Sequence, residues 1–133
     1  MAFEWAYSLD DSDPIIQEFV VKASAVISEG ELCNLESNEA DAGATNDSAF
    51  IGIATHDVDN TVDGHTVKCI VNRYAVYKVA DANARAVGDT LDIATGAQGV
   101  TTSSNVDLRI VKTSSATEPT YVMIAPGEHW LDA

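Results

Sequence analysis

Apolar and polar residues alternate along most of the chain, which is the pattern of β-strands with one buried face. The period of two is clearest in "FVVKASAVI" (19–27), "TVKCIV" (66–71) and "VDLRIV" (106–111). Further strands are predicted at 31–36, 49–55, 74–79, 90–102 (two strands around a glycine-rich turn) and 120–125. We therefore expect an all-β domain of seven to eight short strands, built as a small barrel or a sandwich.

Two departures from regular alternation indicate special backbone geometry. In "AFIGIAT" (49–55), Ile51 and Ile53 fall on one face and Gly52 on the other, so we expect another segment to pack closely against Gly52. The alternation slips at Asn72-Arg73, and a strand changes face only by gaining a residue. We expect a bulge or sharp bend there, with Asn72 as the residue best able to adopt a left-handed conformation.

Three segments lack the strand pattern. "DANARAVGD" (81–89) predicts one short helical turn, capped by Asp81 and ended by Gly88. Residues 37–48 are polar and rich in Gly, Asn and Asp, which indicates an exposed loop. Residues 1–18 show no clean period. The chain is accordingly divided into an extended N-terminal arm (1–18), a β-domain (19–125) and a C-terminal tail (126–133).

Size and charge exclude several classes of function. A chain of 133 residues with 46% hydrophobic residues is long enough for one packed domain. It contains no apolar run near the ~20 residues of a membrane-spanning helix and does not start like a secretory signal, so we expect a soluble product of the cytoplasm. Its net charge of −14 would repel phosphate backbones, which argues against nucleic-acid binding. The acidic surface favours solubility, or a face that keeps copies apart or meets a basic partner.

The two cysteines and His129 suggest no chemistry. Cys33 and Cys69 lie in separate apolar runs without the spacing of a zinc site, so we expect two free buried thiols. His129 belongs to the tail "PGEHWLDA" and is expected at the surface. No GxSxG, GxxxxGK[ST] or GxGxxG motif occurs. We therefore predict no catalytic residue, no cofactor, no small-molecule substrate and no enzymatic activity.

The densest set of potential metal ligands lies between two predicted strands: His56, Asp57, Asp59, Asp63 and His65. A metal site needs three or four converging ligands on well-supported elements, whereas most of these would sit on a loop. The spacing also departs from a calcium loop, because no Glu follows at the twelfth position. Asp63-Gly64 is instead a strong turn signal. We interpret the set as the solvated tip of a hairpin that binds no functional metal.

Four short motifs follow one another in the order seen in a known family: Gly30-Glu31-Leu32, Ile51-Gly52-Ile53-Ala54, Asp63-Gly64 and Gly88-Asp89-Thr90-Leu91. In this order the chain resembles the decoration (cement or head-stabilising) proteins of tailed-phage capsids, of the β-tulip or small β-barrel type. The resemblance covers residues 19–125. Each motif is only turn chemistry between strands, and their shared order is what makes the resemblance specific.

The resemblance implies a compact β-domain that forms homotrimers on the outer surface of the capsid. There the trimers would sit at three-fold positions, bind neighbouring copies of the major capsid protein and stabilise the shell. The implied location is the virion, after synthesis in the host cytoplasm, with no nucleic-acid or membrane partner. An extended N-terminal segment commonly adds to the contact with the shell.

The N-terminal arm carries five large apolar residues among its acids: Phe3, Trp5, Tyr7, Ile15 and Ile16. The three aromatic residues alternate as they would on one face of an extended strand. They either fold back and complete their own core, or lie across a capsid subunit or a neighbouring protomer. On the second account all five are candidate binding residues, and deleting residues 2–13 would leave a folded domain with weaker capsid binding.

Other functions stay open. One is a stand-alone β-sandwich that binds carbohydrate, with Trp5, Tyr74, Tyr77 or Trp130 as stacking surfaces. Another is a different virion component, such as a tail or head-completion protein. The number of copies per virion would separate the latter from a decoration protein.

Overall fold

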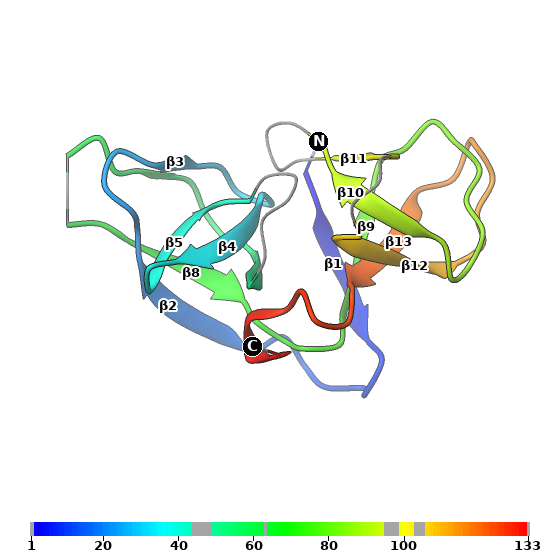
Figure 1. The fold of residues 1–133 in the computed structure, drawn as a ribbon, viewed down its shortest axis with the longest axis horizontal. Coiled ribbons are helices and arrows are strands. Elements are labelled where there is room, and N and C mark those ends of the chain that lie inside the picture. Colours follow the sequence, from blue (N-terminus) through cyan, green and yellow to red (C-terminus); the bar gives the residue numbers. More distant parts are fainter. Residues whose placement is uncertain (1, 44–48, 63, 95–98, 103–105, 133) are drawn as a thin grey trace.

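Short antiparallel strands make up most of the described chain in the computed structural model (Figure 1). The structure describes residues 2–43, 49–62, 64–94, 99–102 and 106–132. The strands are β1 (Glu4–Ser8), β2 (Ile16–Val20), β3 (Val26–Ile27), β4 (Leu32–Glu36), β5 (Glu39–Ala42), β6 (Phe50–Ile53), β7 (Val58–Asp59), β8 (Thr66–Ile70), β9 (Ala75–Val79), β10 (Thr90–Ile93), β11 (Val100–Thr101), β12 (Leu108–Lys112) and β13 (Thr120–Ile124). The all-β prediction is confirmed, although the strands are shorter and more numerous than the seven to eight expected.

The strands form one large sheet and three small ones. The large sheet has six strands in the order β1-β9-β13-β12-β10-β11, and it lies on the right in Figure 1. The small sheets are β2-β8, β3-β7 and β5-β4-β6. Most of the small-sheet strands lie on the left in the same view, and both chain ends lie between the two halves. No helix in the described ranges has the length and apolar character needed to cross a bilayer.

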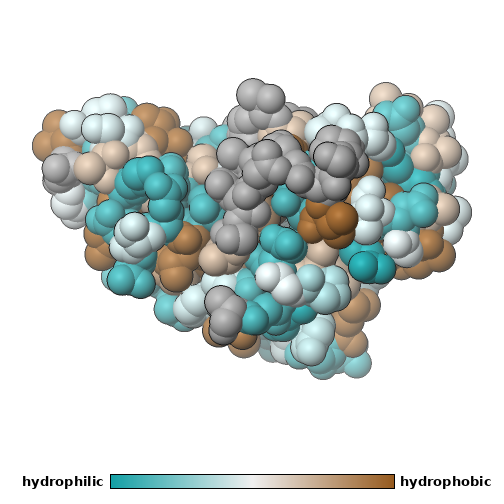
Figure 2. Space-filling model, viewed as in Figure 1, coloured by the Kyte–Doolittle hydropathy of each residue, from teal (hydrophilic) through white to brown (hydrophobic). Residues whose placement is uncertain are grey.

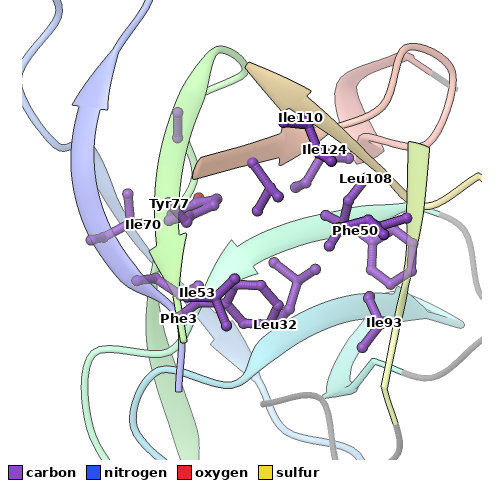
Figure 3. Close-up of a cluster of buried hydrophobic side chains, with 14 residues drawn as sticks. Phe3, Leu32, Phe50, Ile53, Ile70, Tyr77, Ile93, Leu108, Ile110 and Ile124 are labelled. Atoms are coloured by element: carbon purple, nitrogen blue, oxygen red, sulfur yellow. The ribbon is translucent and has the colours of Figure 1, made fainter. Parts of the chain in front are cut away.

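Two hydrophobic cores share three strands. The first core contains Phe3, Leu32, Phe50, Ile53, Ile70, Ala75, Tyr77, Val79, Leu91, Ile93, Leu108, Ile110, Val122 and Ile124 (Figure 3). The second core contains Phe19, Val21, Ile27, Cys33, Ala40, Ile51, Ala54, Val58, Val67, Cys69 and Val71. Strands β4, β6 and β8 supply residues to both cores, so these three strands join the two halves of the molecule.

A bulge in β6 explains how that strand serves both cores. Cys33 pairs with Gly52 and the next residue, Asn34, pairs with Phe50, so Ile51 is the extra residue. Ile51 therefore lies in the second core and Ile53 in the first, and the prediction that they share a face is wrong. The close approach to Gly52 is confirmed, because a Cβ there would lie 1.7 Å from the backbone oxygen of Ile70.

Two predicted segments are divided differently in the structure. The single strand expected at 19–27 is interrupted by a turn, in which Ala25 N–H donates to Lys22 O at 3.1 Å and Ser24 has a φ of 66°. The loop expected at 37–48 contains β5, which pairs with β4. Ser37 and Asn38 both have positive φ, which suits the two-residue turn of a tight hairpin. Residues 44–48 lie outside the described ranges.

The helical turn expected at 81–89 does not form. Arg85 and Ser114 exchange two backbone hydrogen bonds of 3.0 and 2.9 Å, which occupy groups that a helical turn would use. Asp81 receives the Arg85 guanidinium instead of capping a helix, with Arg85 Nε 2.6 Å from Asp81 Oδ2. In the described part of the chain, helical structure occurs as a single 3₁₀ turn at Trp130–Asp132.

The chain bends between β8 and β9, as the slip at Asn72 predicts. Strand β8 pairs with β2, whereas β9 enters the six-stranded sheet. Asn72 accepts a bond from Ala75 N–H through its backbone oxygen at 3.3 Å, but it is not among the residues with positive φ. The expected left-handed conformation is therefore wrong, and the residue acts through its side chain.

Candidate interaction surface

The N-terminal segment is part of the fold rather than an extended arm. Strand β1 pairs with β9 at the edge of the six-stranded sheet, and Phe3 is 2% exposed in the first core. Phe3 N–H donates to Gly30 O at 3.0 Å, which fixes the start of the chain beside the β3–β4 turn. Trp5 packs against the first core and is partly buried. The account in which the aromatic residues complete their own core therefore describes Phe3 and Trp5.

The other three candidate residues of this segment face solvent. Tyr7, Ile15 and Ile16 are 43%, 54% and 49% exposed. Ile16 begins β2, which continues to Val20 and so crosses the boundary expected between residues 18 and 19. The structure thus leaves these three side chains available to a partner, while it buries Phe3.

Asn72 holds the connection between β1 and β2 in place. It is 5% exposed, and its Oδ1 accepts the N–H of Ile15 at 2.7 Å. Its Nδ2 donates to Ser12 Oγ and to Asp13 O, both at 2.9 Å. Three hydrogen bonds from one buried amide fix the backbone on which Ile15 is displayed.

The C-terminal segment also packs on the domain. His129 is 1% exposed, so the prediction of a surface histidine is wrong; its backbone bridges to Phe50 of β6. Burial, with the nearby Arg73 guanidinium, lowers the pKa of His129 to about 4. Trp130 packs edge-on against Phe19, with ring centroids 5.6 Å apart. Residues 126–132 are therefore an integral part of the fold.

An ion pair fixes the last turn. Arg73 Nε lies 2.8 Å from Asp132 Oδ1, and Asp132 Oδ2 accepts the N–H of Gly127 at 2.9 Å. Burial by itself would raise the pKa of Asp132, but the Gly127 bond and the Arg73 charge outweigh it and lower that pKa. The Arg73 guanidinium also lies 5.1 Å from the ring centroid of Tyr74.

These segments enclose a groove of about 420 Å³, which we call the C-terminal groove. Its apolar lining comes from Ile15, Val71, Tyr74, Trp130 and Leu131. Its polar lining comes from Asp10, Ser12, Gln17, Asn72 and Arg73. Such a volume lies within the roughly 300–1,000 Å³ of pockets that take ligands.

The apolar residues of the groove are prominent on this surface. Tyr74 and Leu131 are 46% and 58% exposed, beside Ile15. On the face drawn in Figure 2, hydrophobic residues form separate patches between hydrophilic ones rather than one continuous apolar surface. Exposed apolar side chains gathered around a concavity are a common feature of protein-binding sites.

The polar edge of the groove is acidic. Asp10 lines it, and Asp11 and Asp13 belong to the same connection. Asp10 Oδ1 accepts bonds from Ser8 Oγ at 2.5 Å and from Ser12 Oγ at 2.7 Å, and these bonds lower the Asp10 pKa. Arg73 adds no net charge, because it is paired with Asp132. The groove is thus apolar inside and negative at one edge.

The region 56–65 is more ordered than a free hairpin tip. It contains β7, which pairs with β3, and the buried Asn60, whose Nδ2 donates to Val21 O and Lys22 O at 3.0 Å. His56 Nε2 accepts the N–H of Lys68 at 3.1 Å, so its other ring nitrogen carries the proton. Asp63 lies outside the described ranges. Within them, no three His, Cys, Asp or Glu side chains form a metal-binding group.

Both cysteines are free and buried, as predicted. Cys33 in β4 and Cys69 in β8 belong to the second core, where the neighbouring Cys69 thiol and burial raise the pKa of Cys33. The Cys33 Sγ lies 3.6 Å from Glu31 O. The pair contributes to packing.

Sequence reasoning missed half of the C-terminal groove. It identified Ile15 but assigned Leu131 and Trp130 to a tail, and it considered Tyr74 only as a surface for stacking sugars. The available signal was the apolar pair Trp130-Leu131 in an otherwise polar tail. The bend at Asn72, which was expected, is what brings Tyr74 to the groove.

Comparison with known proteins identifies a shared fold. No family model and no curated protein matches the chain. Among solved structures, the chain is similar to the N base of the head fiber protein gp8.5 of bacteriophage phi29, with a TM-score of 0.53 and 18% sequence identity. The match covers 86% of this chain and 98% of that one, so the likeness extends over nearly the whole domain.

Proposed function

We propose that the chain is a structural protein of a phage virion that binds the outer surface of the head. The observation that carries this proposal is the fold shared with the base of a phage head fiber over 86% of the chain. The order of turn motifs, which resembles capsid decoration proteins, supports the same conclusion independently. The role needs no catalysis, no cofactor and no small-molecule substrate.

The finer proposal is a decoration protein. It binds the major capsid protein as a homotrimer at three-fold positions and stabilises the shell. The surface offered to the capsid includes Tyr7, Ile15 and Ile16, which the structure leaves exposed. Binding only the assembled head would stabilise the shell by mass action.

A second candidate is favoured by the structural match itself. The similar protein is the base of a fiber, so this chain is alternatively the head-bound base to which a further protein or segment attaches. The two roles share a head-binding surface but differ in number: a decoration protein should be present in hundreds of copies, and a fiber base in fewer.

Purified heads test the proposal. Heads of the phage that encodes the chain, prepared without it, should bind the purified protein in a sedimentation assay and withstand higher temperature when it is bound. Bound chains should form clusters of three in a map of the decorated head. Absence of binding would overturn the virion role, and single copies away from three-fold positions would overturn the trimer.

A further inference from the structure

The C-terminal groove has the properties of a preformed docking site. Its two sides are held by strong contacts: the three hydrogen bonds of Asn72 fix one, and the Arg73–Asp132 ion pair fixes the other. Ile15 and Leu131 are nevertheless more than half exposed. A site that is already ordered loses little conformational freedom when a partner binds, which favours affinity.

Charge indicates which partner fits. Asp10 lines the groove, and Asp11 and Asp13 lie in the same short connection but line the neighbouring concavity beside β1. Asp132 neutralises the cation Arg73. A second copy of this chain would bring a net charge of −14 to an already negative edge. Like charges brought together at an interface oppose association, whereas a cationic segment would be attracted.

We propose that the C-terminal groove binds a segment of a partner protein in which apolar side chains are flanked by Lys or Arg. The apolar side chains enter the groove between Ile15, Tyr74 and Leu131. The flanking cations face the connection that carries Asp11 and Asp13. This inference rests on the proposed function in one respect, because it takes the partner segment to belong to the head.

The chemistry can be tested without heads. Three end-blocked peptides, KKLFKK, EELFEE and KKSSKK, are titrated into the ¹⁵N-labelled full chain while amide shifts are recorded. KKLFKK should shift the amides of Ile15, Asn72 and Leu131, with an affinity at least about ten-fold above the other two. Equal binding of EELFEE, equal binding of KKSSKK, or no shift at the groove would each overturn the proposal.

Heads then separate this inference from the proposed function. Ile15→Asp with Leu131→Asp should weaken head binding at least about ten-fold, since apolar anchors dominate interfaces. The matched control is Val26→Asp with Val62→Asp, which alters valines at least as exposed (56% and 75%) in β3 and after β7, and it should bind normally. If heads bind and both double variants bind alike, the groove is not the docking site.

Charge is tested in the same assay. Asp11→Asn with Asp13→Asn leaves the hydrogen bonds of Asp10 intact, and it should weaken binding and reduce its salt dependence. Glu29→Gln with Asp89→Asn removes the same charge elsewhere and should have no effect. If KKLFKK binds the groove but heads do not bind the chain, the docking chemistry stands and the virion role fails.

Discussion

At the scale of single residues, Gly52 marks a close approach between the backbones of β6 and β8. Its φ is +142°, and a Cβ there would lie 1.7 Å from Ile70 O and 2.9 Å from the hydroxyl of Tyr77. The Ile70 oxygen belongs to the backbone of β8, which is paired along its length with β2, so it cannot turn aside as a flexible side chain could. The absence of a side chain at Gly52 is therefore a requirement of the fold.

Replacing Gly52 by Ala should destabilise the protein by more than about 4 kcal/mol or prevent folding, because the clash is with backbone. Gly88→Ala is the matched control: its φ is +91°, but a Cβ there would meet nothing within 4 Å. It should lose only the ~1–2 kcal/mol of a left-handed residue. Urea denaturation of both variants checks this, and losses of equal size would show that backbone strain, not the clash, is decisive.

The buried imidazole of His129 makes stability depend on pH. Its pKa is about 4 in the folded chain against 6.5 for an ordinary histidine. As the pH falls from about 6.5 to 4, the unfolded chain binds a proton that the folded chain does not, so stability decreases by about 3 kcal/mol. Below pH 4 both states are protonated and this loss ends.

The measurement is the free energy of unfolding as a function of pH for the native chain and for His129→Asn. Asn keeps an acceptor for the N–H of Leu131, which His129 Nδ1 accepts at 3.2 Å, but it does not titrate. The difference between the two curves should change only between about pH 6.5 and 4. The carboxylates with lowered pKa, such as Asp81 and Asp132, lose their contribution at lower pH in both proteins. Parallel curves would contradict the assignment.

At the scale of elements, β1 shows how one strand combines stability and display. Phe3, which immediately precedes β1, is 2% exposed, whereas Tyr7 near the end of the strand is 43% exposed. Phe3→Ala should cost about 3–5 kcal/mol through the cavity it leaves, and Tyr7→Ala less than about 1 kcal/mol. Chemical denaturation of both variants provides the test. A mild effect of Phe3→Ala would mean that the N-terminal segment detaches from the core.

Removing the whole element has a different expected result from the one the sequence suggested. Deletion of residues 2–13 would take away β1 and Phe3, uncovering the edge of β9 and opening the first core. We therefore expect the truncated chain to lose its stable fold, so it is not a clean test of head binding. Point variants at exposed positions are the informative ones.

Whether an element could be predicted depends on how far apart in the sequence its contacting residues lie. Alternation in "TVKCIV" correctly placed Val67, Cys69 and Val71 on one buried face, because period two reflects a local geometry. The same rule failed at Ile51 and Ile53, since a bulge opposite β4 is set by a partner strand that local sequence does not reveal. The position of the C-terminal segment was missed for the same reason: His129 is buried by pairing with Phe50, far away in sequence.

The candidate site likewise has a part that the sequence predicts and a part that depends on long-range contacts. Exposure of Ile15 and Ile16 among acids is visible in the sequence, but the groove exists only because the bend at Asn72 and the turn at Trp130–Asp132 meet there. Asn72 was noticed for its backbone, whereas its contribution comes from three side-chain hydrogen bonds to residues about sixty positions earlier. Neither the composition nor the local pattern around Asn72 indicates that its hydrogen-bond partners lie so far away in the sequence.

At the scale of the whole molecule, the question is whether the two halves behave as one. Strands β4, β6 and β8 contribute side chains to both the first and the second core. Loss of either core removes part of the burial that holds these three strands. We therefore expect a single cooperative transition, as in most domains of this size.

The two tryptophans report on the two halves separately, because Trp5 packs against the first core and Trp130 against the second. Trp5 is the one tryptophan left in Trp130→Phe, and Trp130 is the one left in Trp5→Phe. In each variant, unfolding by urea should give the same midpoint and slope by tryptophan fluorescence as by circular dichroism, which reports on the whole chain. Adding Ile110→Ala, a change confined to the first core, should lower both midpoints together by the equivalent of about 2–5 kcal/mol. A Trp130 signal that stays in place while the Trp5 signal moves would show that the halves unfold independently. In that case the C-terminal groove, which Trp130 lines, would persist without the six-stranded sheet.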